Sequence, residues 1–157
     1  MEAQKIHLML NYYPVIGMVI GVIFLLIGSR KKSGRITRIG LVAFMVVALL
    51  ALPALVTGEV AGSALGTSAG AYADALTKHK EMARMTIVAI EATGLAALIG
   101  LFMFRCKSEP AKWFTAAVMV LSLAACGLAA YTTHLGRQVK WAGSASANQK
   151  PVADVGN

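Results

Sequence analysis

The sequence predicts an all-α integral membrane protein, a four-helix bundle with both termini on the outer side of the membrane. Three observations lead to this fold. The 157-residue chain is 57% hydrophobic and 14% charged, with a mean hydropathy of +0.67, whereas a soluble domain is about half apolar and about a quarter charged. The apolar residues form four long runs, each able to span a bilayer. The basic residues gather at the ends of these runs, which is typical of topology signals and lipid contacts and not of a nucleic-acid surface.

The runs define one domain, residues 1–135, with transmembrane helices at about 8–28, 38–58, 80–104 and 110–134. Residues 136–157 are polar and are expected to form a mobile tail on the outer side. The first run reaches ~30 Å at ~1.5 Å per residue, enough to cross the apolar core. We expect it to be retained and not cleaved, because a basic segment follows it and an A-x-A site does not.

Charge in the connections predicts the orientation. The segment from Ser29 to Arg38 carries five basic residues and no acid, and RCKSEPAK carries three basic residues against Glu109. Lys and Arg concentrate in cytoplasmic loops. Both connections are therefore expected in the cytoplasm, with the termini in the periplasm, for a multi-pass protein of the bacterial inner membrane.

Small residues indicate where the helices pack. Gly17 and Gly21 in the first run form a small-xxx-small pair, which lets another helix approach closely. The second run, with Pro53 near its far end, is expected only to pack. In the third run a face of small or weakly polar residues extends from His79 to Gly100 and suits either close packing or a flat cofactor. The fourth run carries a similar face that ends at His134.

The three histidines are expected at one membrane face. His7 precedes the first run, His79 precedes the third and His134 follows the fourth, so any four-crossing topology brings them to the same side. Two neutral imidazoles facing each other across a bundle can bind the iron of a b-type haem. Two of the three histidines are therefore candidate iron ligands, and Asn11 and Tyr13 are further cofactor-binding candidates on the first helix.

Other chemistry fits the same residues. Three imidazoles can hold a first-row metal ion, and Met9, Met82 and Met85 add soft ligands that suit copper. A quinone site is another option, with a histidine and Tyr12 or Tyr13 bonded to the carbonyls. The ordinary alternative is that the histidines lie at the interface and bond to water and loop carbonyls.

Glu91 is the acid placed deep in an apolar run. An ionisable group in hydrocarbon is costly and marks a candidate functional site. Glu91 would relay protons or bind a polar headgroup, or else a neighbouring threonine or backbone carbonyl would hold it. It lies about 18 Å along the helix from His79, so one site does not easily include both.

Three motifs resemble those of a family of small, cytochrome b-like four-helix bacterial membrane proteins. The motifs are IHLMLNYYPVIG, LVTGE before a helix that opens HKEMA, and AYTTHLGRQVKW. The resemblance covers most of residues 5–141 and implies b-type haem binding through His7, His79 and His134. The chain differs in having Arg137 where the family has a second glycine and Trp141 where a further histidine often stands, so the resemblance favours one haem over two.

These observations predict a small electron-transfer subunit. It would hold a b-type haem near the outer face and exchange electrons between the quinone pool and an outer-side redox partner, within a larger membrane complex. No nucleophile–base pair or phosphate loop is evident in the sequence, so catalysis by this chain alone is not expected. A second hypothesis is a cofactor-free accessory subunit, and a third is a copper-handling membrane protein. The expected partners are the lipid bilayer and other membrane or periplasmic redox subunits, and no nucleic acid.

Overall fold

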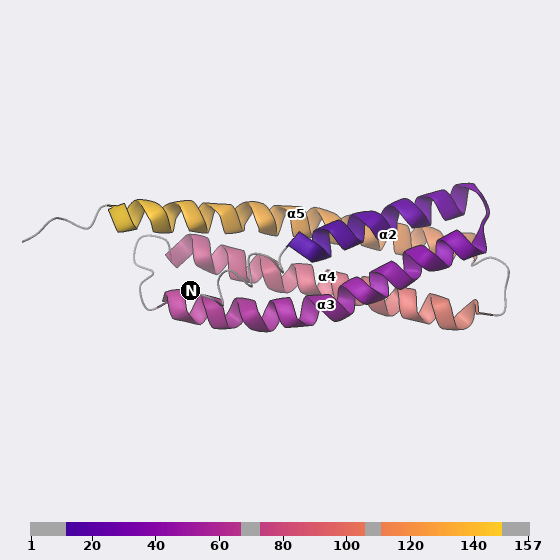
Figure 1. Ribbon diagram of the computed structural model, residues 1–157, viewed down its shortest axis with the longest axis horizontal. Helices are drawn as coiled ribbons and strands as arrows, with labels where there is room; N and C mark the ends of the chain where they lie inside the picture. Colours follow the sequence, from indigo (N-terminus) through magenta and orange to yellow (C-terminus); the bar gives the residue numbers. More distant parts are fainter. Residues whose placement is uncertain (1–11, 67–72, 106–110, 149–157) are drawn as a thin grey trace, which may run out of the picture.

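The computed structural model describes residues 12–66, 73–105 and 111–148, and these form one elongated four-helix bundle (Figure 1). The helices are α2 (Tyr12–Arg30), α3 (Gly34–Gly66), α4 (Ala73–Met103) and α5 (Lys112–Asn148). Both α2 and α4 pack against α3 and α5, while α2 and α4 make no close contact with each other in the described part of the chain. The helices therefore form a ring in which sequence neighbours lie side by side and α5 closes against α2.

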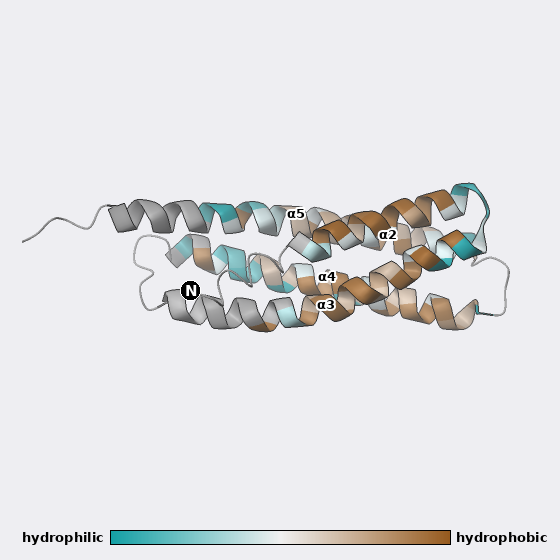
Figure 2. Cartoon of the chain, viewed as in Figure 1, coloured by the Kyte–Doolittle hydropathy of each residue, from teal (hydrophilic) through white to brown (hydrophobic). Residues whose placement is uncertain are grey.

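All four helices are long and apolar enough to cross a membrane, with candidate spans Tyr13–Arg30, Gly34–Pro53, Leu76–Met103 and Lys112–Gln138. Hydrophobic residues cover the middle of the bundle and hydrophilic residues lie towards its ends (Figure 2). Large apolar side chains are exposed on every helix, among them Ile16, Leu49, Val88, Phe102 and Val120. Such a surface is costly in water and matches lipid tails. The predicted four-helix membrane bundle is confirmed.

Three helices extend past the ends of the apolar runs. α3 continues to Gly66 instead of ending at about 58, α4 begins at Ala73 instead of 80, and α5 continues to Asn148 through much of the segment expected to be a mobile tail. Hydropathy marks only the part of a helix that lies in lipid, and these extensions are rich in alanine, the residue with the highest helix propensity. The 37 residues of α5 therefore reach about 55 Å, well beyond the ~30 Å apolar thickness of a bilayer.

Two capping motifs meet in the short turn between α2 and α3. The Ser33 N–H donates to the Gly28 carbonyl (2.9 Å) and the Lys32 N–H to the Ser29 carbonyl (3.4 Å), the pattern of a Schellman motif. Lys32 has a φ of 49°, the left-handed conformation that glycine usually takes at this position. The Ser33 Oγ then accepts a hydrogen bond from the Ile36 N–H at the start of α3 (3.5 Å).

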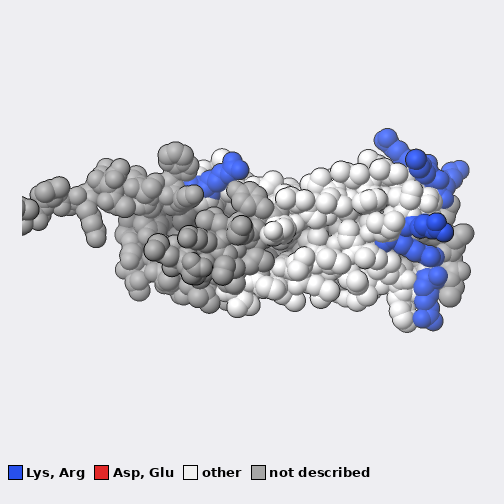
Figure 3. All heavy atoms as spheres, in the orientation of Figure 1, with Lys and Arg blue, Asp and Glu red and all other residues white. Residues whose placement is uncertain are grey.

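Basic residues gather at the end of the bundle that contains this turn, which we call the basic end (Figure 3). Its members are Arg30, Lys31, Lys32, Arg35, Arg38, Arg105 and Lys112. Arg38 of α3 also holds the end of α4, because its Nη2 donates to the carbonyls of Phe104 (3.0 Å) and Arg105 (3.3 Å). Phe104 and Arg105 directly follow the last residue of α4, so Arg38 caps α4 from a neighbouring helix.

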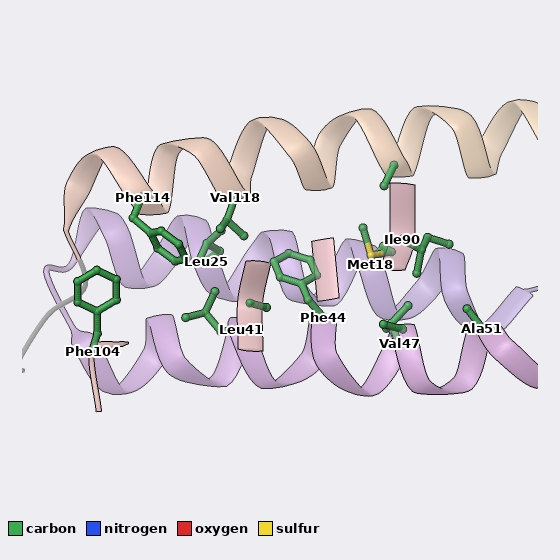
Figure 4. Close-up of a cluster of buried hydrophobic side chains, with 13 residues drawn as sticks. Met18, Leu25, Leu41, Phe44, Val47, Ala51, Ile90, Phe104, Phe114 and Val118 are labelled. Carbon is green, nitrogen blue, oxygen red and sulfur yellow. The ribbon is translucent and has the colours of Figure 1, made fainter. Parts of the chain in front are cut away.

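Glycines allow close approach between α2 and α3. A Cβ at Gly21 would overlap the ring of Phe44, and a Cβ at Gly17 would overlap the side chain of Val47. Phe44 is fully buried and lies in the middle of the apolar core (Figure 4). The small-xxx-small pair predicted in the first run therefore forms the surface on which α3 packs.

Glycines also allow neighbouring helices to approach α4 closely. A Cβ at Gly94 would overlap the Cβ of Ala48 on α3, and a Cβ at Gly100 would overlap the ring of Phe114 on α5. Lipid tails are as apolar as the helices, so the packing of such complementary surfaces is a main source of association within the membrane.

Candidate functional site

His79 and His134 lie at the end of the bundle opposite the basic end, which we call the histidine end. His79 is in the second turn of α4, and His134 lies well before the end of α5, where that helix leaves its apolar region. The long extensions of α3, α4 and α5 reach this end. The two histidines therefore lie towards the same end of the bundle, on neighbouring helices.

The imidazole of His79 packs into the surface of α5. The ring is half-buried, and its Nδ1 lies 3.2 Å from the carbonyl oxygen of Thr132. A Cβ at Gly136 would lie 3.1 Å from Cε1 of the ring, so the absence of a side chain at this position gives the imidazole its space. A carbonyl oxygen only accepts, so the contact is a hydrogen bond in the tautomer that carries its proton on Nδ1. In that tautomer Nε2 carries the lone pair.

His134 points away from this contact. It lies two positions after Thr132, which is about 200° around the helix, so it is nearly opposite the face of α5 that touches His79. Its side chain is exposed, and its Nε2 lies 3.2 Å from Nε2 of Gln138 one turn later. An amide nitrogen only donates, so Nε2 of His134 is the acceptor. The imidazoles of His79 and His134 do not face each other within one chain.

The small-residue face that ends at His134 is also turned outward. Leu123, Gly127 and Ala130 are exposed, and a Cβ at Gly127 would have no atom within 4 Å. This face was expected to be similar to the small-residue face of the third run, but these three residues are not covered by a neighbouring helix. Small residues permit close approach but do not determine which side of a helix is covered.

A buried threonine pair lies beneath His79. The hydroxyls of Thr86 on α4 and Thr132 on α5 are 2.7 Å apart. Thr86 donates its proton to the carbonyl of Met82 (2.8 Å), so the hydroxyl of Thr132 is the donor within the pair. Thr132 of α5 therefore contacts two residues of α4: its carbonyl lies against the imidazole of His79, and its hydroxyl bonds to Thr86 in the core.

Below this pair the predicted small-residue face of α4 is filled by its neighbours. Thr93 and Ala97 are fully buried, and the ring of Phe114 covers Gly100. The sequence suggested that this face serves either close helix packing or a flat cofactor, and in the structure it serves close helix packing. A flat cofactor that used His79 would therefore lie at the end of the bundle, above Thr86 and Thr132, and not along the core.

The remaining predicted site residues are separate from His79. Tyr13 is exposed in the first turn of α2, a helix that does not contact α4 within the described residues. Met82 is half-buried and Met85 is exposed. His7, Asn11 and Met9 lie outside the described residues. In the described ranges no group of three or more His, Cys, Asp or Glu side chains is close enough to hold a metal ion.

Glu91 lies in the apolar part of α4, away from the histidine end. Its Oε1 is buried and has no hydrogen-bond partner among the described residues. The hydroxyls of Thr86 and Thr93 on the same helix are bonded to the carbonyls of Met82 and Ala89 instead. One alternative from the sequence was a hydrogen bond between Glu91 and a neighbouring threonine, and neither Thr86 nor Thr93 makes it.

Sequence reasoning missed Thr132 and Gly136. Both are small residues in a helix that carries many, and neither stands out by type. They become recognisable only when the pairing of α4 with α5 is known, because His79 contacts both of them one helical turn apart.

Comparison with protein-family models, curated proteins and solved structures gives no match for this chain.

Proposed function

We propose that this protein is a small membrane electron-transfer subunit that binds one b-type haem at its histidine end, with His79 as an axial ligand. The observation that carries the proposal is the orientation of the His79 imidazole. Histidines that bind a metal usually donate the other ring N–H to a carboxylate or a backbone carbonyl, which fixes the ring and the tautomer. The contact of Nδ1 with the Thr132 carbonyl has this form.

The surroundings of His79 favour iron ligation through Nε2. The Nδ1–H tautomer leaves the lone pair on Nε2, which is the nitrogen that would bind the iron. Gly136 gives room along the edge of the ring. A b-type haem bound here would supply one-electron redox chemistry, and Thr132 and Gly136 would position its ligand.

We assign the second axial position to His7. We do not propose His134 as the partner of His79, because it projects from the opposite side of α5. His7 is the remaining histidine, and it precedes α2 by five positions in the sequence. Asn11 and Tyr13 of the same segment are proposed contacts for a quinone, with the exposed phenol of Tyr13 reachable from the bilayer.

The distribution of charge supports an orientation for this subunit. The basic end carries seven Lys and Arg residues and no described acid, the pattern of a cytoplasmic face. We therefore propose that the histidine end and both termini lie in the periplasm of a bacterial inner membrane. Electrons would pass between the quinone pool and a redox partner at the periplasmic surface.

Single-histidine variants test the ligand assignment. The wild-type protein and its His7→Ala, His79→Ala and His134→Ala variants are purified in detergent from haem-replete cells, and their reduced-minus-oxidised spectra are compared at equal protein concentration. The proposal predicts loss of the six-coordinate b-type spectrum in the first two variants and its retention in His134→Ala. A spectrum that depends on His134 and not on His79 contradicts the assignment.

A second candidate function is a cofactor-free accessory subunit that anchors a larger membrane complex. It is favoured by the close packing of the α4 face, where neighbours occupy the space that a cofactor within the core would need. This function predicts that His79→Ala leaves the recovery of the assembled complex unchanged. The wild-type protein would then contain neither haem nor copper by absorption and metal analysis.

A further inference from the structure

We propose that Glu91 is a proton-binding site inside the membrane, a carboxyl that takes up and releases a proton within the apolar span of α4. The proposal is independent of haem binding. It begins from the buried Oε1 of Glu91, which has no hydrogen-bond partner in the described part of the chain. An unpaired carboxylate oxygen in such surroundings is strongly disfavoured.

The side chain lies on the flank of α4 that faces α3. Gly94 contacts Ala48 of α3, and Thr86 contacts Thr132 of α5, so these two positions mark the directions of the neighbouring helices. Glu91 is about 60° from Gly94 and about 140° from Thr86 around the helix axis. The residue is half-buried there, so part of its side chain is exposed on the outside of the bundle.

The carboxyl is deep in the span, at a similar distance from His79 and from Phe104. Phe104, at the basic end of α4, lies thirteen positions away, or about 20 Å along the axis. Arg84, towards the histidine end, lies seven positions away, or about 10 Å, and shares the face of Glu91.

The segments that pack against this part of α4 offer no cation at this depth. The α3 sequence between Arg38 and Pro53 has no titratable residue. In α5, the only titratable residues between Lys112 and His134 are Cys126 and Tyr131, neither of which is a cation. Arg84 is the nearest basic residue on α4 itself, about two turns away.

The chemistry favours a proton as the ligand. Ca²⁺ needs six to eight oxygen ligands and Mg²⁺ a near-octahedral set, whereas a proton needs one carboxyl. The carboxylate takes a proton from water to form an O–H bond, which removes the charge from the apolar region, and release returns the proton to water.

Infrared spectroscopy tests the proposal directly, because it detects the protonated carboxyl group itself and needs no added probe. The full-length protein in lipid nanodiscs is measured over a pH series in H₂O and D₂O, together with Glu91→Gln and Glu81→Gln, the second of which changes an exposed carboxyl on the same helix. The expected result is a carbonyl band of a protonated carboxyl at neutral pH, which shifts in D₂O and disappears at high pH. This band should be absent from Glu91→Gln and unchanged in Glu81→Gln.

Two results would overturn the proposal. If no such band appears between neutral and mildly acidic pH, the carboxyl is charged in the membrane. If the band persists at every pH and does not shift in D₂O, the proton is held permanently and is not exchanged. Helical circular dichroism of Glu91→Gln, together with a shifted band in Glu91→Asp, separates loss of the site from loss of the fold.

Discussion

Replacing Gly94 with alanine should separate α3 from α4. The added Cβ would lie closer than 3.0 Å to the Cβ of Ala48, whereas carbon atoms in contact are about 3.5–4.0 Å apart. Both atoms are attached directly to helix backbones, so no rotamer change relieves the overlap and the helices must move apart by roughly 1 Å. Overpacking of this kind costs about 1–3 kcal/mol, partly offset by up to ~1 kcal/mol from the higher helix propensity of alanine. The expected net loss of stability is about 1–2 kcal/mol.

Removing the methyl group of Ala48 tests whether the overlap with the new Cβ at position 94 causes the loss of stability. Ala48→Gly alone should cost about 1–2 kcal/mol, from lost packing and the lower helix propensity of glycine. The Ala48→Gly/Gly94→Ala double variant exchanges the methyl between the two helices, so its stability should return to within about 1 kcal/mol of the wild type, with a coupling energy in the ~0.5–3 kcal/mol range of contacting residues.

The assay is unfolding of the purified protein in mixed micelles as the fraction of sodium dodecyl sulfate rises, followed by helical circular dichroism. Gly127→Ala is the matched control, because no atom lies within 4 Å of its added Cβ. It should be neutral or stabilising by up to ~1 kcal/mol. Additive losses in the double variant, or an equal loss in Gly127→Ala, would refute the account of α3–α4 packing.

Two further predictions concern the turn and the threonine pair. Lys32→Gly should stabilise the protein by up to about 1 kcal/mol in the same unfolding assay, since Lys32 occupies a left-handed conformation; no change or a loss would show that this conformation carries no strain. Thr132→Val should cost about 0.6 kcal/mol, and at most about 1.7 kcal/mol, from the lost interhelical hydrogen bond. Thr133→Val, whose hydroxyl bonds only within α5 to Ala129, should change stability less, and an equal loss would contradict the pairing with α4.

Hydropathy was sufficient to predict the number and order of the membrane-spanning helices. The apolar runs correspond to α2, α3, α4 and α5, and the Gly17 and Gly21 pair correctly marks a packing surface. The helix ends at the histidine end were not predictable in the same way. Gly66 and Asn148 end helices that have already left the apolar region, and hydropathy carries no information about a helix in water.

The candidate site was predictable only in part. Placing His79 and His134 at one end follows from topology alone. Their directions do not, because they depend on which face of α5 meets α4. The small residues before His134 suggested a face turned towards the bundle, whereas His79 contacts Thr132 and Gly136 on the other side of that helix. Knowing which face of α5 packs against α4 would have been enough to predict the direction of His134 correctly.

The most direct test of the account is the absorption spectrum of the wild-type protein, purified from haem-replete cells and recorded air-oxidised and then dithionite-reduced. The account predicts sharp reduced α and Soret bands of a six-coordinate b-type haem, at one haem per chain. A featureless spectrum in both states would contradict the electron-transfer function.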